Sequence, residues 1–545
     1  MENFISEQVF ASSTWSYFER AIARFLIHRG WEHVDLVGKV GDHGADVIAT
    51  TGGQDYAIQV KYSQNNTRLA VDIVGDVVRA MDFYEIDNGL CISNRNLGLG
   101  QKSRMKEYRE LGYKIGSFTG AHILEELEAL PDWIKEPFTA KNYQLECIAE
   151  LKKSFVLKEE RGLISLATGM GKTYVACSFI KWLYQNDPYL NIVILAHQEE
   201  LLNQFERSLW PFLPKYVKTH ILTSDHQRPN FNGGVLLSTF GVFPNWYNEM
   251  EGVDFDIAVV DEAHHSRAST YERVIRMVDV DYLLGLTATP YRADGLDVTE
   301  IFGKPLVFYD VARGIQNKFL SEVDYRLRCH NIDKDWIQDK SLKGYTIKQL
   351  NKKLFIEERE EYICQEFVDY FRKENRKSAV IFCQSVLHAD LIKNILTANY
   401  NFSCGVITNK YDSKDNAKTL RDFRNGRLQV VTTVDMLNEG VDVPDIDFIC
   451  FLRVTHSRVY FLQQLGRGLR YQKNKTLLVL DFVADLRQIK AVQRQRDMFF
   501  DSEEEFLDLE SGFKLSFSND FTDDFLDLVS KEIENEFLEE NYMVE

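Results

Sequence analysis

The sequence lacks the cysteine patterns of zinc sites and disulfide frameworks, and it lacks a membrane-spanning run. Eight cysteines are scattered over 545 residues, and none forms a Cys-x-x-Cys pair. The first eight residues contain no basic stretch followed by an apolar core, and no uncharged run reaches the ~18 residues that a membrane helix needs. These absences argue against a disulfide-stapled secreted module and against a membrane protein. We expect a soluble protein of the reducing cytoplasm.

The net charge of −18 would disfavour a nucleic-acid partner if it were spread evenly, because phosphate binding depends on Lys and Arg. It is not spread evenly. Residues 501–545 hold 16 acidic and 2 basic residues, which leaves 66 acidic and 62 basic residues over 1–500. The charge therefore does not exclude nucleic acid as a partner of residues 1–500.

The length and the 45% hydrophobic content suit roughly three or four domains. Patterning predicts an α/β unit over 1–130, with helices near 13–29 and 71–81 and strands near 46–49, 56–62 and 89–92. After prolines at 131 and 137, apolar strands alternate with helices, which is typical of parallel sheets. We expect an α/β protein with two such units, over 131–328 and 329–490, and an acidic, partly helical segment over 491–545.

A phosphate-binding loop is predicted after the apolar strand Leu163–Leu166. The loop is Ala167–Gly171, and Lys172 and Thr173 open an apolar helix. Backbone N–H groups at such a helix start cradle phosphates, a lysine neutralises them, and a threonine holds Mg²⁺. The first glycine of the usual pattern is replaced by Leu166. The residues predicted to bind ATP here are Thr168, Gly169, Gly171, Lys172 and Thr173.

Two carboxylates follow the apolar strand Ile257–Val260. At the carboxyl end of a strand beside a phosphate loop, Asp261 can hold Mg²⁺ and Glu262 can orient the attacking water. A solvated turn is the alternative interpretation of Asp-Glu-Ala-His in isolation. The Asp-Glu-Ala-His segment follows four apolar residues and lies downstream of the phosphate loop, which favours a catalytic role for its two carboxylates.

With Leu286–Arg292 added, the pattern resembles the superfamily 2 helicases of the DEAH type. Further segments match that family in the correct order: Asn142–Gln144, Leu195–His197, Ser238–Phe240, Ile381–Cys383, Asn438–Pro444 and Gln463–Arg470. The resemblance spans about 138–481 and implies two RecA-like lobes that use ATP and Mg²⁺. It also implies that Gln144, Gly440 and Asp442 contribute to nucleotide binding, and that Arg467 and Arg470 stabilise charge on the transferred phosphoryl group.

A second phosphate-ester site is predicted near the start of the chain. The strand period of two places Gln59 and Lys61 on one face, and Asp46 precedes them on the neighbouring strand. A carboxylate and an amide oxygen that bind Mg²⁺, together with a lysine, would permit metal-assisted phosphodiester hydrolysis. A solvated hairpin with a polar face is the alternative when these residues are taken alone.

The local frame of these residues resembles the Mrr-type branch of restriction endonuclease-like nucleases. The matching segments are Trp15–Arg29, Gly41–Asp46, Gln59–Ser63 and Gly89–Asn94. In that branch glutamine replaces the usual acid, which favours one firmly bound Mg²⁺ over two. The resemblance implies a DNA endonuclease in which Glu19 adds a carboxylate. His43 is more often an exposed loop histidine in such a context than a general base.

We therefore expect an ATP-dependent DNA helicase or translocase with a Mg²⁺-dependent nuclease domain, resembling restriction and antiphage defence proteins. Its partners would be single- or double-stranded DNA and a protein of such a defence system, with no membrane. The first alternative is a repair or recombination helicase whose N-terminal domain only binds DNA. The second is an RNA remodeller, which stimulation of ATP hydrolysis by RNA but not by DNA would indicate.

Overall fold

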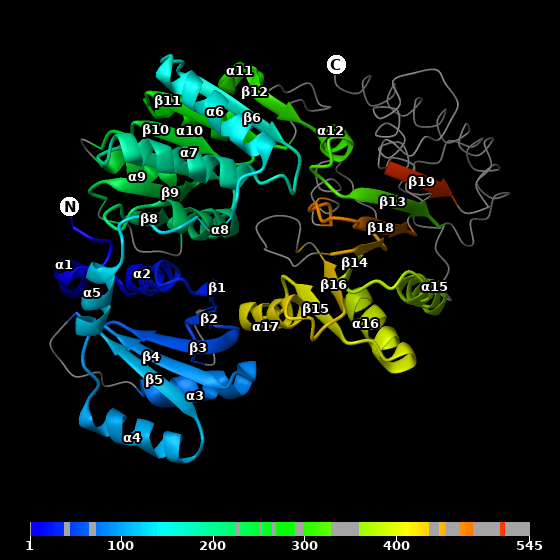
Figure 1. The fold of residues 1–545 in the computed structure, drawn as a ribbon, viewed down its shortest axis with the longest axis horizontal. Coiled ribbons are helices and arrows are strands. Elements are labelled where there is room, and N and C mark those ends of the chain that lie inside the picture. The colour runs from blue at the N-terminus through cyan, green and yellow to red at the C-terminus, as the bar shows by residue number, and fades with distance from the viewer. Residues whose placement is uncertain are drawn as a thin grey trace. The chain divides into compact units, whose positions relative to one another are not determined.

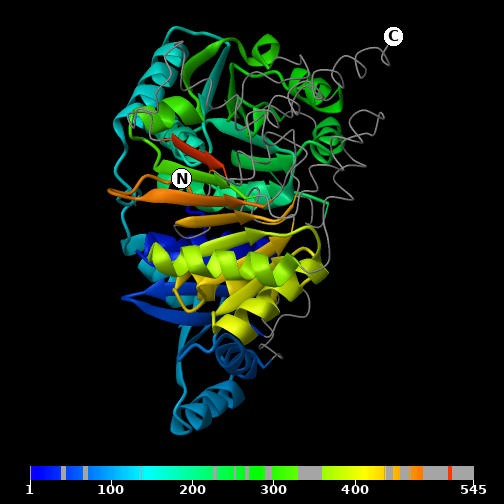
Figure 2. The same cartoon turned by 90° about the vertical axis from the view of Figure 1, so that its right-hand side faces the viewer.

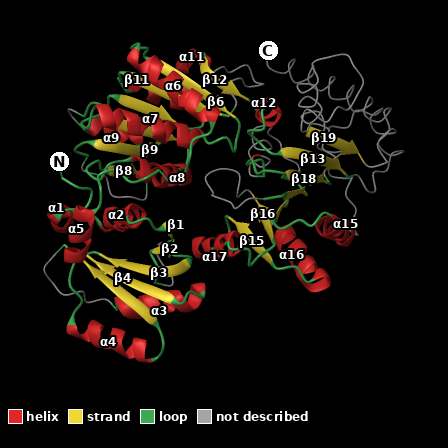
Figure 3. Cartoon of the chain, viewed as in Figure 1, coloured by secondary structure: helices red, strands yellow, loops and turns green. Residues whose placement is uncertain are grey.

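The computed structural model describes most of the chain. The described residues are 2–37, 44–64, 72–136, 138–224, 229, 231–250, 253–263, 269–288, 298–328, 359–434, 436, 446–453, 466, 468–482 and 513–517. The chain divides into two compact units, one of residues 1–166 and 171–308, the other of residues 167–170 and 309–545. The mixed α/β class predicted from the sequence is confirmed in both units (Figures 1 and 3).

The first ~130 residues form a five-stranded sheet in the order β1-β2-β3-β4-β5. Strands β1, β2 and β3 pair antiparallel, whereas β3, β4 and β5 pair parallel. The elements are α1 (Glu7–Ser12), α2 (Trp15–His28), β1 (Glu32–Leu36), β2 (Val47–Thr51), β3 (Gln54–Lys61), α3 (Ile73–Tyr84), β4 (Asn88–Ser93), α4 (Leu99–Glu110), β5 (Lys114–Thr119) and α5 (Gly120–Ala129).

The alternation of side chains along β3 separates the core from the site. Ile58 and Val60 join the apolar cluster that holds α2 and α5 against one face of the sheet. Helix α3 packs on the other face, where Val77 and Met81 lie so close to Gly89 of β4 that a side chain there would collide with them. Gln59 and Lys61 alternate with Ile58 and Val60, so they lie on the α3 face.

The following region contains a seven-stranded sheet in the order β12-β6-β11-β10-β7-β9-β8. Within it, each strand from β6 to β8 in this order pairs in parallel with its neighbour. Its strands are continuous apolar runs because helices cover both faces of such sheets. The elements are α6 (Asn142–Val156), β6 (Arg161–Leu166), α7 (Lys172–Asn186), β7 (Asn191–Ala196), α8 (Glu199–Leu209), the 3-10 turn η1 (Trp210–Phe212), β8 (Thr219–Leu222), β9 (Gly234–Thr239), α9 (Phe243–Glu249), β10 (Ile257–Val260), α10 (Ser269–Met277), β11 (Tyr282–Thr287), α11 (Thr299–Phe302) and β12 (Pro305–Tyr309).

The second unit is built on a parallel seven-stranded sheet in the order β15-β16-β14-β17-β18-β13-β19. Helices α15 and α16 pack together against one face of it, through a core that includes Phe367 and Ile392 (Figure 2). The elements are α12 (Val311–Gln316), β13 (Glu322–Leu327), α15 (Arg359–Lys373), β14 (Ala379–Phe382), α16 (Val386–Tyr400), β15 (Cys404–Thr408), α17 (Ser413–Arg424), β16 (Val430–Val434), β17 (Phe448–Phe451), β18 (Thr476–Asp481) and β19 (Phe513–Phe517).

Two strands of the second sheet come from outside the region expected for it. Strand β13 precedes the expected boundary at residue 328, yet it pairs in parallel with β18. Strand β19 lies within the acidic segment 491–545 and pairs in parallel with β13. The helical part expected of this acidic segment lies outside the described residues. Among the described helices, none is both long and apolar enough to cross a membrane.

In the first unit, helix α2 of the N-terminal domain docks on α8, η1 and β8 of the first parallel sheet. Arg20 pairs with Glu206, whose side chain is 1% exposed. Arg24, which is also 1% exposed, donates to the carbonyl oxygens of Val217 at 2.7 Å and Pro214 at 2.9 Å. Trp210 of η1 belongs to the apolar cluster of the N-terminal domain. The two domains therefore share a buried interface with its own polar contacts.

Arg24→Met should destabilise this unit by about 2–4 kcal/mol, because it removes two charge-assisted hydrogen bonds and leaves the buried Val217 carbonyl without its Arg24 donor, whereas Pro214 still accepts the Val217 N–H. Unfolding in urea, followed by pulse proteolysis, measures the change. Arg276→Met is a suitable control, because Arg276 is 67% exposed and pairs within its own helix with Glu272. An Arg24→Met protein as stable as the control would contradict the role assigned to this interface.

Stability should fall as the pH falls from about 6.5 to about 4, because two histidines are buried near this interface. Burial lowers the pKa of His28 to about 3 and the pKa of His220 to about 4. The unfolded chain binds protons at both positions near pH 6.5, whereas the folded chain does not, so folding is disfavoured below that pH. Between pH 6.5 and 5 each histidine should cost at most about 2 kcal/mol.

The measurement is the urea midpoint of wild type and of a His28→Gln, His220→Gln variant at pH 7.5 and pH 5. The double variant should lose less stability on acidification than the wild type does. Equal losses in the two proteins would show that these histidines do not set the pH dependence.

Candidate functional site

The structure brings Asp46, Gln59 and Lys61 to one end of the N-terminal sheet. The backbone N–H of Asp46 bonds the Ile58 carbonyl at 2.9 Å, which places Asp46 beside β3. The Asp46 carboxylate accepts a hydrogen bond from the Gln59 side-chain amide and another, at 2.6 Å, from the Val60 N–H. Asp46 and Gln59 are 2% and 1% exposed. Gln59 and Lys61 thus lie in β3, and Asp46 directly precedes the adjacent strand β2.

The Gln59 side-chain amide is only partly satisfied by hydrogen bonds within the described residues. Its nitrogen donates to Asp46, while its buried Oε1 atom has no hydrogen-bond partner among the described residues. An orphaned buried carbonyl oxygen is costly unless something binds it. An oxygen donor beside a carboxylate suits Mg²⁺, which takes oxygen ligands. Within the part of the chain that the structure describes, no group of three or more His, Cys, Asp or Glu side chains is placed to hold a metal ion.

Lys61 has a partner that the sequence analysis missed. Its Nζ atom lies 3.4 Å from Oδ2 of Asp76, in the first turn of α3. Asp76 is 15 residues downstream, and nothing in a local strand pattern pairs it with Lys61. The available signal was the pair of acids, Asp72 and Asp76, at the start of the helix that follows the strand.

Glu19 and His43 are the further residues that the sequence raises for this site. Glu19 is buried on α2, which packs on the face of the sheet opposite α3. Its contribution to a metal site stays a prediction. His43 lies outside the described residues.

The phosphate loop has the predicted form. Gly169 and Gly171 adopt left-handed φ angles of 88° and 83°, and α7 begins directly after Gly171. Glycine reaches these angles without steric cost, and the start of a helix is the kind of backbone that binds anions. Lys172 is buried, and its Nζ atom lies 3.3 Å from Oε1 of Glu262.

Asp261 and Glu262 follow β10, and in the sheet order β11 separates β10 from β6 and its phosphate loop. The Glu262 N–H donates to Asp261 Oδ1 at 3.0 Å. Glu262 has a left-handed φ of 47°, which is uncommon for a residue with a side chain and is often found at functional sites. This turn directs the Glu262 carboxylate toward Lys172.

Gln144 also lies at the phosphate loop. Its buried side chain packs on Gly171, so closely that an added Cβ at Gly171 would lie 2.6 Å from Gln144 Nε2. Its Oε1 accepts the Lys141 N–H at 2.9 Å. Thr173 is in the first turn of α7. The buried Thr168 hydroxyl has no hydrogen-bond partner within the described ranges.

The remaining predicted residues belong to the second unit. Gly440, Asp442 and Arg467 lie outside the described residues. Arg470 is exposed, and its backbone bridges to Leu320, while its carbonyl oxygen accepts the Ser321 hydroxyl at 2.8 Å.

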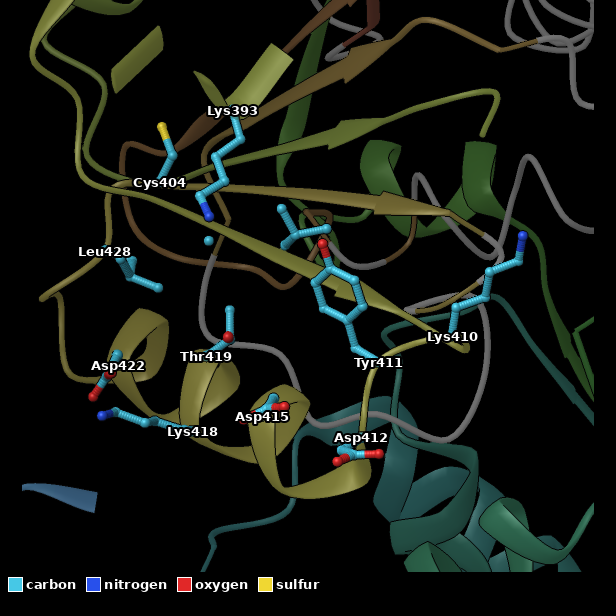
Figure 4. A pocket seen from close by; sticks show the side chains of 12 residues that line it. Lys393, Cys404, Lys410, Tyr411, Asp412, Asp415, Lys418, Thr419, Asp422 and Leu428 are labelled. Atoms are coloured by element: carbon cyan, nitrogen blue, oxygen red, sulfur yellow. The ribbon is translucent and has the colours of Figure 1, made fainter. Parts of the chain in front are cut away.

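A polar pocket opens in the second unit between β15 and the helices α16 and α17 (Figure 4). Lys393 and Tyr411 extend into it. Tyr411 donates to Asp390 at 2.6 Å. The lining residues of this pocket do not include those predicted to bind ATP, metal or nucleic acid.

The fold and these sites define a restriction endonuclease-like α/β domain followed by RecA-like motor domains. Family models agree with that division. Residues 10–109 match a family described as "Restriction endonuclease", residues 137–292 match "Type III restriction enzyme, res subunit", and residues 358–472 match "Helicase conserved C-terminal domain". The matched segments are thus similar to helicase motor domains that follow an N-terminal restriction endonuclease-like domain.

Individual proteins with related sequences are helicases, translocases and restriction subunits. The Escherichia coli "Type I restriction enzyme EcoAI endonuclease subunit" is 26% identical over 62% of this chain and 45% of its own length. The Sulfurisphaera tokodaii "DNA 3'-5' translocase XPB2" is 25% identical over 74% of this chain and 97% of its own length. The solved structure of "ATP-dependent Type ISP restriction-modification enzyme LlaBIII bound to DNA" shares the fold, with a TM-score of 0.56 and 16% identity over 98% of this chain and 43% of that one. This chain spans 55%, 65% and 45% of three of its curated relatives.

Proposed function

We propose that this chain is an ATP-dependent DNA helicase or translocase with a DEAH-type motor, and that its N-terminal domain cleaves DNA phosphodiesters with Mg²⁺. Two groups of contacts support the proposal: the buried Asp46 carboxylate bonded to Gln59, in the strand that also carries Lys61, and Lys172 paired with Glu262. Similarity to restriction endonuclease subunits supports a role in restriction or antiphage defence.

In the nuclease domain, Asp46 and the Gln59 carbonyl oxygen would hold Mg²⁺, with Glu19 as a further predicted ligand. The ion would polarise the scissile phosphate and supply a nucleophilic water at neutral pH. Lys61 places a positive charge beside the same face of the sheet, where it neutralises charge that develops on the phosphate. The Gln59 amide nitrogen donates a hydrogen bond to the Asp46 carboxylate. This bond would orient the amide so that its oxygen faces the metal ion.

In the motor, the loop residues Gly169 and Gly171 present backbone N–H groups to the phosphates of ATP. Lys172 would neutralise the β and γ oxygens, and its pairing with Glu262 brings the proposed water-orienting carboxylate next to that lysine. Thr173 and Asp261 would hold Mg²⁺, and Glu262 would orient the attacking water. We assign adenine recognition to Gln144, nucleotide contacts to Thr168, Gly440 and Asp442, and transition-state stabilisation to Arg467 and Arg470.

We propose four parts: a nuclease over 1–130, two motor lobes and an acidic segment over 491–545. The first lobe follows residue 131. The second includes residues up to about 490, and we begin it before β13, because β13 pairs with β18 of the second sheet. DNA, single- or double-stranded, is the proposed partner, together with a protein of the same defence system. We propose the cytoplasm as its location.

ATP turnover measured with DNA and with RNA tests the motor assignment. DNA should stimulate hydrolysis, and single-stranded, double-stranded, forked and modified DNA should be compared for both turnover and cleavage. Stimulation by RNA but not DNA would contradict a DNA motor. Stimulation by DNA without cleavage of any of these substrates would favour the alternative of a repair helicase whose N-terminal domain only binds DNA.

A further inference from the structure

Asp76 touches the candidate nuclease site through its side chain. Its Oδ2 atom lies 3.4 Å from Nζ of Lys61, and the two side chains are 15% and 23% exposed. Partial burial weakens solvent screening, so this pair holds its geometry better than an ion pair on open surface. Asp76 sits in the first turn of α3, whose start is fixed by the Asp72 side chain, which accepts the Gly75 N–H at 3.0 Å.

The Asp76 carboxylate is held from a second direction. Its Oδ1 atom pairs with Arg79 one turn further along α3, while Oδ2 faces Lys61. Arg79 is 61% exposed, so it anchors the carboxylate from the solvent side. The two oxygens therefore have separate partners, and the one that faces Lys61 is oriented by the other.

The backbone of Asp76 touches the other half of the site. Gly44, two residues before Asp46, has a left-handed φ of 89°, and any Cβ at this position would collide with the Asp76 carbonyl oxygen. Gly44 thus packs directly on the first turn of α3. Asp76 therefore contacts Lys61 through its side chain and Gly44, which leads into Asp46, through its backbone.

A lysine side chain has four rotatable bonds, and ordering it costs conformational entropy. A catalytic lysine that is already ordered before DNA binds loses less entropy on reaching the transition state, and supporting residues of this kind commonly change activity strongly when mutated. We propose that Asp76 is the positioning residue of the nuclease: it holds Lys61 ready for the scissile phosphate and acts on cleavage through Lys61. This inference rests on the proposed nuclease activity.

Asp76→Asn should lower kcat for Mg²⁺-dependent DNA cleavage by about 10- to 100-fold, with little change in KM for DNA. Asp76→Glu, which restores the carboxylate, should recover most of the lost rate. Asp82→Asn is the matched control, because it removes an acid from the same helix, and the Asp82 carboxylate accepts the Tyr113 hydroxyl at 3.1 Å instead of facing Lys61. This control should cleave at the wild-type rate.

A second measurement follows the ion pair itself. Reductive methylation of lysines, read by mass spectrometry, should modify Lys61 several times faster in Asp76→Asn than in the wild type, because the paired ammonium is less available than a free amine. Lys102, an exposed lysine of α4, should be modified equally in both proteins.

The outcomes separate this inference from the nuclease proposal. A wild type that cuts, a Lys61→Ala variant that does not, and an Asp76→Asn variant at the wild-type or a higher rate would overturn the role of Asp76 and leave the nuclease in place. A loss of cleavage without any change at Lys61 would also overturn it, by showing that Asp76 acts structurally or on the metal. A wild type that cuts no DNA would refute the nuclease and, with it, a positioning residue for it.

Discussion

Asp46→Asn is expected to abolish Mg²⁺-dependent DNA cleavage while DNA-stimulated ATP hydrolysis continues. The change removes the buried carboxylate charge that would hold the metal, yet its amide oxygen can still accept the Val60 N–H that Asp46 accepts at 2.6 Å. The loss of a metal-bound charge should cost about 3 kcal/mol or more at the transition state, which is a rate loss above about a hundredfold. Nicking of closed circular DNA, measured on gels over time, reports the rate.

A matched variant guards against a simple folding defect. Asp55→Asn changes an acid at the other end of β3, where Asp55 accepts the Thr50 hydroxyl at 2.8 Å. It should cut normally. Equal cleavage by Asp46→Asn and Asp55→Asn would remove Asp46 from the catalytic site.

Lys172→Ala is expected to stop ATP hydrolysis almost completely. Lys172 is buried at the phosphate loop and supplies the positive charge that offsets the β and γ oxygens. Removal of one preorganised charge contact of this kind lowers turnover by at least about a hundredfold. A coupled assay of ATP turnover with saturating DNA measures the effect.

Lys181→Ala on the same helix is the appropriate comparison, because Lys181 pairs with Glu136 at 2.8 Å rather than with the phosphate loop. It should keep its ATPase activity. Undiminished hydrolysis by Lys172→Ala would show that the loop after β6 is not the nucleotide site. Cleavage of DNA at the normal rate by Lys172→Ala would show that motor and nuclease work independently.

Local features of the two sites could be predicted because strand periodicity and loop chemistry act over a few residues. The predicted helix near 13–29 is α2 at Trp15–His28, and the strand near 56–62 is β3 at Gln54–Lys61. Gln59 and Lys61 share a face because side chains alternate along any strand. The phosphate loop was predictable because left-handed glycines and a following helix start have a local sequence pattern.

Contacts between distant segments could not be predicted from those local rules. The pair of Lys61 with Asp76 depends on how α3 returns across the sheet, and the pair of Arg20 with Glu206 joins residues 186 positions apart. The placement of β13 and β19 beside one another depends on pairing across long connections, which leaves no periodic trace in the sequence. The left-handed backbone of Glu262 is likewise set by its surroundings rather than by its residue type.

One reaction can separate the two activities: cleavage of closed circular DNA by wild type and by Asp46→Asn, with Mg²⁺ and ATP, while ATP consumption is recorded. We expect both proteins to consume ATP when DNA is present and only the wild type to introduce breaks. Intact DNA in the wild-type reaction, with ATP consumed at the same rate in both, would contradict this expectation.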